Sequence, residues 1–276
     1  GTAGRFAPGL PAKGDGQLLF MLNGLAKLKD DGQMAIIQNG SSLFNGDAGS
    51  GPSEIRRYLI ENDWLDAIVQ LPNNAFYNTG IATYIWLVMK NKPVTHQGKV
   101  QLIDASNCAS SRRKNIGLKN VDITKACRDL IVKAYGAYVD ETYKGIEENG
   151  NAIIVKSKVM DSVDLGYNKI VVETPQFDEN GNVMMKKNKL MVDTSKRDTE
   201  NVPLAEDIDA YFEREVIPYN PHAWVDKSKT KVGYEIPFTR TFYEYKKIEP
   251  SGVIAARIEE HEKGLMAKLH ELFGGE

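Results

Sequence analysis

The sequence predicts an α/β fold, in which helices cover both faces of a mostly parallel sheet that has one antiparallel strand near its C-terminal edge. Helical and strand patterns alternate over residues 17–103, which is typical of a doubly wound sheet. The strands are nearly continuous apolar runs, as expected when both of their faces are buried. The connection over residues 71–81 has no helical pattern and is too short for a crossover, so its two flanking strands are predicted to be antiparallel.

Each predicted element follows from a local pattern. The first helix, over residues 17–29, repeats leucine and methionine at spacings of three and four. Pro52 suits the first turn of a helix and opens the second one. The strands are apolar runs rich in β-branched and aromatic residues, at 34–37, 65–71, 81–89 and 100–103. These elements are predicted to form the first domain, residues 1–105.

The composition limits the classes of function. At 276 residues, with 42% hydrophobic and 26% charged content, the chain is long enough for one large or two smaller domains. It has neither a secretory signal nor the roughly 18 consecutive apolar residues of a membrane span, so we expect a cytoplasmic protein without membrane contact. Cys108 and Cys127 lack metal-binding spacing, so no metal site is predicted. The net charge of −2 implies that any DNA contact is local or shared with a partner. The first residue is Gly1 rather than Met, which indicates a fragment.

The loop at residues 71–81, Leu-Pro-Asn-Asn-Ala-Phe-Tyr-Asn-Thr-Gly-Ile, is the most informative motif. Two adjacent aromatic rings, Phe76 and Tyr77, are followed by Asn78 and Thr79 between two predicted strands. Ring faces can stack on a nucleobase, and the amide and hydroxyl can form hydrogen bonds with it. These four residues are therefore the candidate base-binding site. The alternative is that the two rings only fill the end of the sheet.

Two further segments are candidate ligand contacts. Asn39 and Gly40 follow a predicted strand at its carboxyl end, where doubly wound folds place ligands, although an ordinary turn has the same sequence pattern. A glycine-rich loop at 45–52 leads into the second helix. Its free amides, together with Arg56 and Arg57, are candidate contacts for a DNA phosphate, with a mobile surface connection as the alternative.

The rest of the chain is predicted to form two segments. Residues 106–165 are expected to be a mainly helical insertion or linker. Its basic residues, including Arg112 and Arg113, are candidate phosphate contacts, with a solvated helix face as the alternative.

Residues 166–276 form the third predicted segment. It contains a hairpin over 172–192 that turns at 178–182, and a short amphipathic helix over 207–216. A terminal helix follows, with apolar residues at the three- and four-residue spacings of a coiled coil. Its candidate partner-docking residues are Ile254, Ile258, Leu265 and Leu269.

Segments along most of the chain point to one family. They are Gln-Asn-Gly-Ser-Ser-Leu-Phe at 38–44, Ile-Arg-Arg-Tyr-Leu-Ile-Glu-Asn-Asp-Trp-Leu-Asp-Ala-Ile at 55–68, the loop at 71–81, Val-Val-Glu-Thr-Pro at 171–175, Lys-Arg-Asp-Thr-Glu-Asn-Val-Pro-Leu at 196–204 and Gly-Tyr-Glu-Ile-Pro-Phe-Thr-Arg at 233–240. They resemble the modification (methylation) subunit of type I restriction-modification systems, an adenine-N6 DNA methyltransferase. The resemblance implies that residues 1–105 are the second half of an S-adenosylmethionine-dependent methyltransferase sheet.

The resemblance also implies an activity and partners. The intact protein is expected to transfer a methyl group from S-adenosylmethionine to a flipped adenine of DNA. Its partners are expected to be DNA, a specificity subunit that reads the DNA sequence, and a restriction subunit. The terminal helix is then the candidate contact with the specificity subunit, and packing on the chain's own body is the alternative.

Two motifs of that family are missing from this sequence. The family's Asn/Asp-Pro-Pro-Phe/Tyr tetrapeptide holds the target amine, and a glycine-rich strand-to-helix turn holds the methyl donor. The chain contains neither motif and is expected to begin just after the tetrapeptide. We therefore expect no catalytic residue in this chain, and neither donor binding nor methyl transfer by the chain alone. The alternative function is a non-catalytic interaction scaffold that binds a specificity subunit and DNA.

By the same resemblance, the loop at 71–81 contributes an aromatic ring that packs on the flipped base. Neighbouring side chains on an extended chain point to opposite faces, so one of Phe76 and Tyr77 should face the base while the other packs inward. We favour Phe76 for the base, because the hydroxyl of an outer Tyr77 can be satisfied elsewhere.

Overall fold

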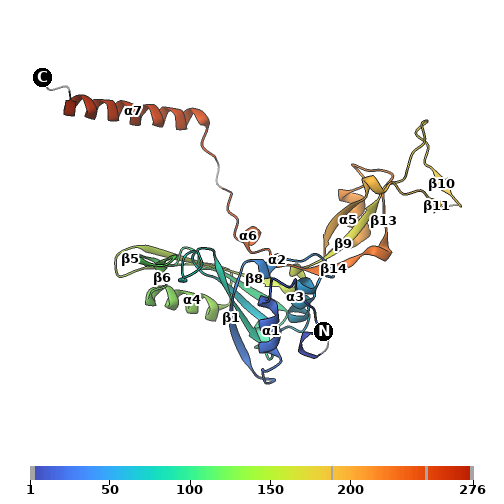
Figure 1. The fold of residues 1–276 in the computed structure, drawn as a ribbon, viewed down its shortest axis with the longest axis horizontal. Coiled ribbons are helices and arrows are strands. Elements are labelled where there is room, and N and C mark those ends of the chain that lie inside the picture. The colour runs from blue at the N-terminus through green and yellow to red at the C-terminus, as the bar shows by residue number, and fades with distance from the viewer. Residues whose placement is uncertain (1–3, 188, 246–247, 274–276) are drawn as a thin grey trace. The chain divides into compact units, whose positions relative to one another are not determined.

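The chain forms two compact units, Gly1–Phe242 and Tyr243–Glu276 (Figure 1). The computed structural model describes residues 4–187, 189–245 and 248–273. The expected divisions at residues 105 and 165 do not coincide with these units, because strands from both sides of residue 105 belong to the same sheet.

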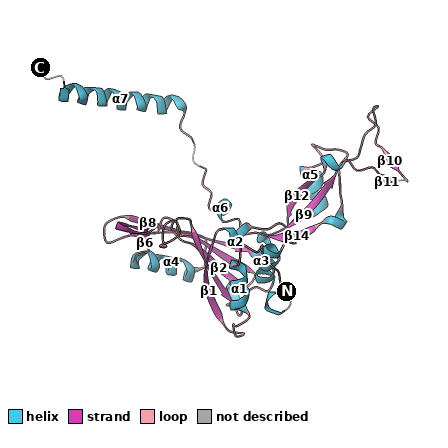
Figure 2. Cartoon of the chain, in the orientation of Figure 1, coloured by secondary structure: helices cyan, strands magenta, loops and turns pink. Residues whose placement is uncertain are grey.

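The main sheet has six strands in the order β1-β3-β2-β4-β8-β7. Figure 2 draws the strands of the chain in magenta. Its strands are β1 (Gln33–Asn39), β2 (Leu65–Gln70), β3 (Thr83–Met89), β4 (Lys99–Asp104), β7 (Glu141–Ile146) and β8 (Ala152–Asp161). β2 and β4 are parallel, whereas β3 is antiparallel to β1 and β2, and β8 is antiparallel to β4 and β7. The predicted α/β sheet and the antiparallel pairing of β2 with β3 are confirmed, but the sheet has a second antiparallel strand, β8, where a single one was predicted. β3 lies inside the sheet, however, not at its edge.

Helices cover both faces of this sheet, as predicted. One face packs on α1 (Gln17–Leu25) and α3 (Gly51–Glu61), and the other packs on α4 (Lys125–Ala137). The neighbouring β2 residues Ile68 and Val69 enter different cores, as the alternation of a strand requires. The predicted apolar face of α1 is buried, and the Thr124 side chain caps the start of α4.

The prediction that residues 106–165 are mainly helical is wrong. This segment contains one α-helix, α4, and four strands, namely β7, β8, β5 (Ser110–Ile116) and β6 (Lys119–Asp122). β5 and β6 form a separate two-stranded hairpin with an irregular register. Most residues of β5 are exposed, so the strand carries no apolar alternation from which it could be recognised.

A second, smaller sheet is built around β9 (Gly166–Glu173). It pairs antiparallel with β12 (Asp198–Pro203), β13 (Trp224–Val225) and β14 (Lys231–Tyr234). The predicted helix after residue 207 is confirmed as α5 (Ile208–Glu215), whose Phe212 enters the core of this sheet. Two four-residue helices, α2 (Ser41–Phe44) and α6 (Phe238–Thr241), complete the unit.

The predicted hairpin over 172–192 is confirmed at its turn, and Pro175 also bridges Val192 near its open end. Phe177 bridges Val183, and the amide of Asp178 donates to the carbonyl of Asn182 at 2.9 Å. The strands that follow are short and pair with each other, β10 (Met185–Lys186) with β11 (Lys189–Leu190).

Arg56 connects α3 to the second sheet and is fully buried. Its Nε donates to the carbonyl of Tyr234 at 2.6 Å, and its Nη1 donates to the carbonyl of Ser42 at 3.1 Å. Burial lowers the pKa of Arg56 to about 10. The prediction that Arg56 contacts a DNA phosphate is therefore wrong, because its guanidinium group is enclosed by the chain's own backbone.

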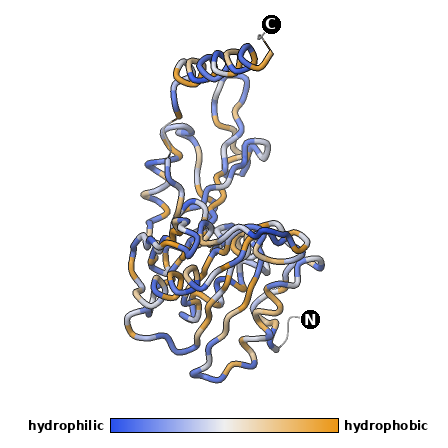
Figure 3. The backbone as a smooth tube through the Cα atoms, turned by 90° about the vertical axis from the view of Figure 1, so that its left-hand side faces the viewer, coloured by the Kyte–Doolittle hydropathy of each residue, from blue (hydrophilic) through white to orange (hydrophobic). Residues whose placement is uncertain are grey.

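The second unit contains one long helix, α7 (Ser251–Phe273), which confirms the predicted terminal helix. None of its described residues is buried. Hydrophobic and hydrophilic residues alternate along it (Figure 3). In the described part of the chain, no helix combines the length and the apolar character that crossing a bilayer requires.

Candidate nucleic-acid interface

The candidate base-binding loop lies at the carboxyl edge of the main sheet. Asn39 at the end of β1 is paired with Thr83, and Gln70 at the end of β2 is paired with Asp104 at the end of β4. The three parallel strands therefore end level with one another, and the loop joins β2 to β3 at this edge. Ligands of doubly wound folds bind at the carboxyl ends of the strands.

The loop forms a tight turn with one ring inside and one outside. Phe76 bridges Thr79, which puts Tyr77 and Asn78 at the tip. Phe76 is half-buried and packs against the core under α4, whereas Tyr77 is 57% exposed. This packing favours Tyr77 over Phe76 as the ring that is free to meet a base, because the inward ring contributes to the core, and the base-binding role of either ring stays a prediction.

The β5–β6 hairpin supports the tip of the loop, a contact that the sequence analysis did not foresee. The amide of Leu118 donates to the carbonyl of Tyr77 at 2.8 Å, and the amide of Asn120 donates to the carbonyl of Asn74 at 3.2 Å. The Lys119 ammonium lies 5.5 Å from the centroid of the Tyr77 ring. Two backbone hydrogen bonds and one cation–π contact thus fix the loop, and the hairpin residues that make them are not among the candidate site residues of the sequence analysis.

Gly117 permits this contact. Its φ is +59°, and a Cβ atom there would lie 2.5 Å from the carbonyl oxygen of Tyr77. We expect Gly117→Ala to cost about 1–2 kcal/mol for the left-handed backbone and also to separate the hairpin from the loop. Amide hydrogen exchange at Leu118 is the measurement.

Gly98→Ala is the matched control, because Gly98 also has a positive φ, +69°, but nothing lies within 4 Å of its Cβ position. This control should show only the backbone cost, with unchanged exchange at Leu118. Equal protection of Leu118 in both variants contradicts the supporting role of the hairpin.

The other candidate phosphate contacts differ in whether their charges are paired. Arg112 forms a hydrogen-bonded ion pair with Asp122, and the hydrogen bond from Arg112 holds the pKa of Asp122 below its usual value. Arg57 pairs with Glu61 and Glu54. Arg113 is exposed and forms no ion pair with any described residue. Phosphate contact by Arg57, Arg112 and Arg113 stays a prediction, with Arg113 carrying the most accessible charge.

Asn39 lies in a turn that is held by hydrogen bonds to its neighbours. The Asn39 Oδ1 accepts hydrogen bonds from Gln17 Nε2 at 2.9 Å and from Ser41 Oγ at 2.6 Å, and the Asn39 backbone amide donates to Gln17 Oε1. A Cβ atom on Gly40 would lie 3.3 Å from the Tyr84 ring. This geometry favours the ordinary-turn reading of Asn39 and Gly40, since the acceptor of Asn39 is already occupied.

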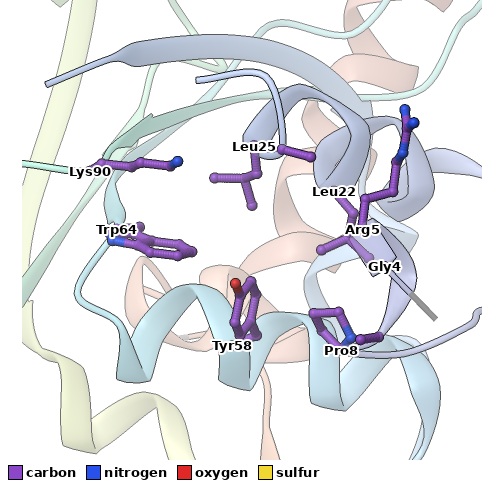
Figure 4. A pocket seen from close by; sticks show the side chains of 10 residues that line it. Gly4, Arg5, Pro8, Leu22, Leu25, Tyr58, Trp64 and Lys90 are labelled. Atoms are coloured by element: carbon purple, nitrogen blue, oxygen red, sulfur yellow. The ribbon is translucent and has the colours of Figure 1, made fainter. Parts of the chain in front are cut away.

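A cavity of about 440 Å³ lies at the other edge of the sheet (Figure 4). Trp64, which precedes β2, and Lys90, which follows β3, line it together with Tyr58. The Trp64 and Tyr58 rings meet edge to face at 5.2 Å. None of the predicted site residues lines this cavity. In the described part of the chain, no group of three or more His, Cys, Asp or Glu residues could hold a metal ion.

The mixed sheet and the loop at its carboxyl edge define an α/β fold of the doubly wound class. The family model described as "N-6 DNA Methylase" matches residues 2–163, which is more than half of the chain. The chain therefore belongs to the N-6 DNA methylase family.

Its relatives include methylase subunits of type I restriction enzymes. The chain is 32% identical over 109 residues to the MjaIX methylase subunit of Methanocaldococcus jannaschii, covering 39% of this chain and 19% of that protein. It is 35% identical over 124 residues to the MpnII methylase subunit of Mycoplasma pneumoniae, covering 45% and 21%. The chain thus spans about a fifth of the length of these relatives.

Among solved structures, the chain is similar to a type I restriction-modification methyltransferase subunit from Streptococcus thermophilus. The identity is 27% and the TM-score is 0.47, and the match covers 58% of this chain and 30% of that one.

Proposed function

We propose that this chain is part of a type I modification subunit, a DNA adenine-N6 methyltransferase, and that it supplies one wall of the pocket for the flipped adenine. The observation that carries the proposal is the exposed ring of Tyr77 at the carboxyl edge of a sheet from the N-6 DNA methylase family. A flipped base is held by stacking and by hydrogen bonds. Tyr77 offers the stacking face, while Asn78 and Thr79 offer polar groups beside it.

The basic hairpin complements this wall. Extruding a base brings the flanking phosphates close to the protein, and phosphate contacts fix the register of the duplex. Arg113 and Lys114 are exposed on the hairpin whose other strand contacts the Tyr77 loop. Their charges are local, which agrees with a chain whose net charge is −2.

The methyl donor of the intact protein is proposed to be S-adenosylmethionine. The polar groups at the end of β1 bond to one another, which supports the expectation that these groups do not hold the donor. The sequence also lacks the tetrapeptide and the glycine-rich turn of the family. We therefore expect the 276-residue chain alone to give no binding signal with S-adenosylmethionine in isothermal titration calorimetry. Micromolar binding contradicts this part of the proposal.

The proposed protein partners are a specificity subunit and a restriction subunit, with α7 as the contact for the specificity subunit. We expect alanine at Ile254, Ile258, Leu265 and Leu269 together to abolish co-elution with the specificity subunit, because the apolar stripe of the helix is removed. Alanine at Glu259, Glu262, Lys263 and Lys268 on the same helix is the matched control and should leave the complex intact. An intact complex with the apolar variant contradicts the assignment.

A non-catalytic interaction scaffold is the second candidate function. The observation that favours it is the exposed apolar stripe of α7, which suits a chain whose role is docking. The coding sequence upstream of Gly1 distinguishes the two functions. An Asn-Pro-Pro-Phe-like tetrapeptide there supports the enzyme, and its absence supports the scaffold.

A further inference from the structure

The cavity at the amino edge of the main sheet combines an aromatic and apolar lining with two cations. Its volume of about 440 Å³ lies within the range of cavities that bind ligands. Leu25, Tyr58 and Trp64 are among its apolar and aromatic lining residues, and Arg5 and Lys90 are its charged ones. None of the described lining residues is acidic, so the lining is positively charged.

Tyr58 and Trp64 form an aromatic wall that is already in place. Tyr58 lies on α3 and Trp64 directly precedes β2, and their ring centroids are 5.2 Å apart in an edge-to-face contact. The Trp64 carbonyl accepts a hydrogen bond from the Met89 amide at 2.9 Å, which fixes this end of β2 beside β3. Both rings are only partly buried. An apolar group that enters the cavity therefore removes ring surface from water.

The two cations of the lining have neutral partners. Lys90 Nζ donates to the carbonyl of Leu28 at 2.9 Å and lies 5.7 Å from the centroid of the Trp64 ring. Arg5 Nη1 donates to Asn23 Oδ1 at 2.5 Å. Neither cation forms an ion pair with any residue that the structure describes. A lysine ammonium group has three N–H donors, so Lys90 keeps donors for an anionic group.

Figure 4 shows how these groups face the cavity. The Tyr58 hydroxyl and the Lys90 ammonium group both point toward the space that the labelled side chains surround, and the Trp64 ring lies beside them. A ligand in this space can therefore meet an aromatic surface and a hydrogen-bonding cation at the same time.

We propose that this cavity binds a segment of a partner polypeptide in which an aromatic side chain stands beside a carboxylate. The ring of the partner packs against Tyr58, Trp64 and Leu25. The carboxylate accepts a charge-assisted hydrogen bond from the Lys90 ammonium group. The site does not depend on the proposed base-holding role, because it lies at the opposite edge of the sheet from the Tyr77 loop.

DNA fits this cavity less well than an acidic polypeptide does. Phosphate binding along a duplex relies on many Lys and Arg contacts, whereas this lining has two cations. The bases that could occupy the aromatic wall are stacked inside a duplex. A free metal cation would be repelled by Arg5 and Lys90.

The test is an NMR titration of the 276-residue chain with three capped dipeptides. N-acetyl-Phe-Asp-amide carries both the ring and the carboxylate, N-acetyl-Phe-Asn-amide lacks the charge, and N-acetyl-Ala-Asp-amide lacks the ring. We expect the Phe-Asp peptide to shift the indole N–H signal of Trp64 and the amide signal of Lys90. The other two peptides should each bind on the order of tenfold more weakly.

Two results overturn the proposal. One is comparable binding of all three peptides, or no shift with the Phe-Asp peptide. The other is a short DNA duplex that shifts the same signals at lower concentrations than the Phe-Asp peptide, because DNA is then the preferred ligand.

A variant pair assigns the charge to Lys90. Lys90→Met keeps an apolar stem and removes the ammonium group, so it should weaken binding of the Phe-Asp peptide on the order of tenfold and leave binding of the Phe-Asn peptide unchanged. Lys27→Met is the matched control, because Lys27 is exposed and follows the lining residue Ala26 without lining the cavity itself. It should change binding no more than about twofold. Should Lys90→Met fail to fold, the three peptides on the unmodified chain still decide.

Discussion

Replacing Arg56 by alanine is expected to destabilise the unit Gly1–Phe242 by about 3–5 kcal/mol. The guanidinium group is fully buried and bonds to the backbone carbonyls of Tyr234 and Ser42. Alanine leaves these carbonyls without donors and opens a cavity between α3 and the second sheet. Urea unfolding followed by circular dichroism measures the loss.

Arg57→Ala is the matched control, one residue further along the same helix. Arg57 is partly exposed, and its bonds to Glu61 and Glu54 are surface ion pairs. Its removal should cost less than about 1 kcal/mol. If Arg56→Ala weakens DNA binding without lowering stability, the buried structural role of Arg56 is contradicted and a contact between Arg56 and a DNA phosphate is supported instead.

Tyr77→Ala is expected to reduce the methylation rate of the assembled modification enzyme about ten- to hundredfold, the range of losses that accompany removal of one base–aromatic stack. The ring is exposed at the tip of the loop, so its removal leaves the core under α4 intact. Tyr77→Phe keeps the stacking face and should retain most of the rate. Steady-state kinetics with DNA as the varied substrate is the measurement.

Phe76→Leu separates the two aromatic roles. Phe76 packs against the core, so leucine there should lower the stability while leaving the stacking ring in place. We expect a lower unfolding midpoint with a methylation rate within about threefold of the unmodified enzyme, since no contact with the base is lost. The reverse pattern, a stable enzyme with a large loss of rate, assigns the base to Phe76 instead.

Local patterns in the sequence predicted four of the six strands of the main sheet. The helix starting at Gln17, the strands up to Asp104 and the antiparallel β2–β3 pair all follow from apolar periodicity and the short loop between them, whereas β7 and β8 lie in the segment that was predicted to be mainly helical. These elements bury strongly patterned faces, so their signal is local. The inward and outward positions of Phe76 and Tyr77 were also expected from neighbour alternation, although which ring faces outward depends on the core under α4.

The remaining features depend on contacts between distant parts of the chain. The sequence pattern predicts that Arg56 is a surface residue of an amphipathic helix. In the structure it is buried, and its guanidinium group donates to the carbonyl of Tyr234, 178 residues later in the sequence. The β5–β6 hairpin is recognisable only by its pairing and by its bonds to the Tyr77 loop.

The most direct test of the base-holding role is a double-mutant cycle that combines Tyr77→Ala with removal of the target base. The affinity of the assembled enzyme is measured for duplexes that carry either adenine or an abasic site at the target position. We predict a coupling energy of about 1–3 kcal/mol between Tyr77 and the adenine, and a value near zero for the matched Phe76→Leu cycle. Coupling near zero for Tyr77 contradicts the base-holding role, because the exposed ring then makes no contact with the flipped base.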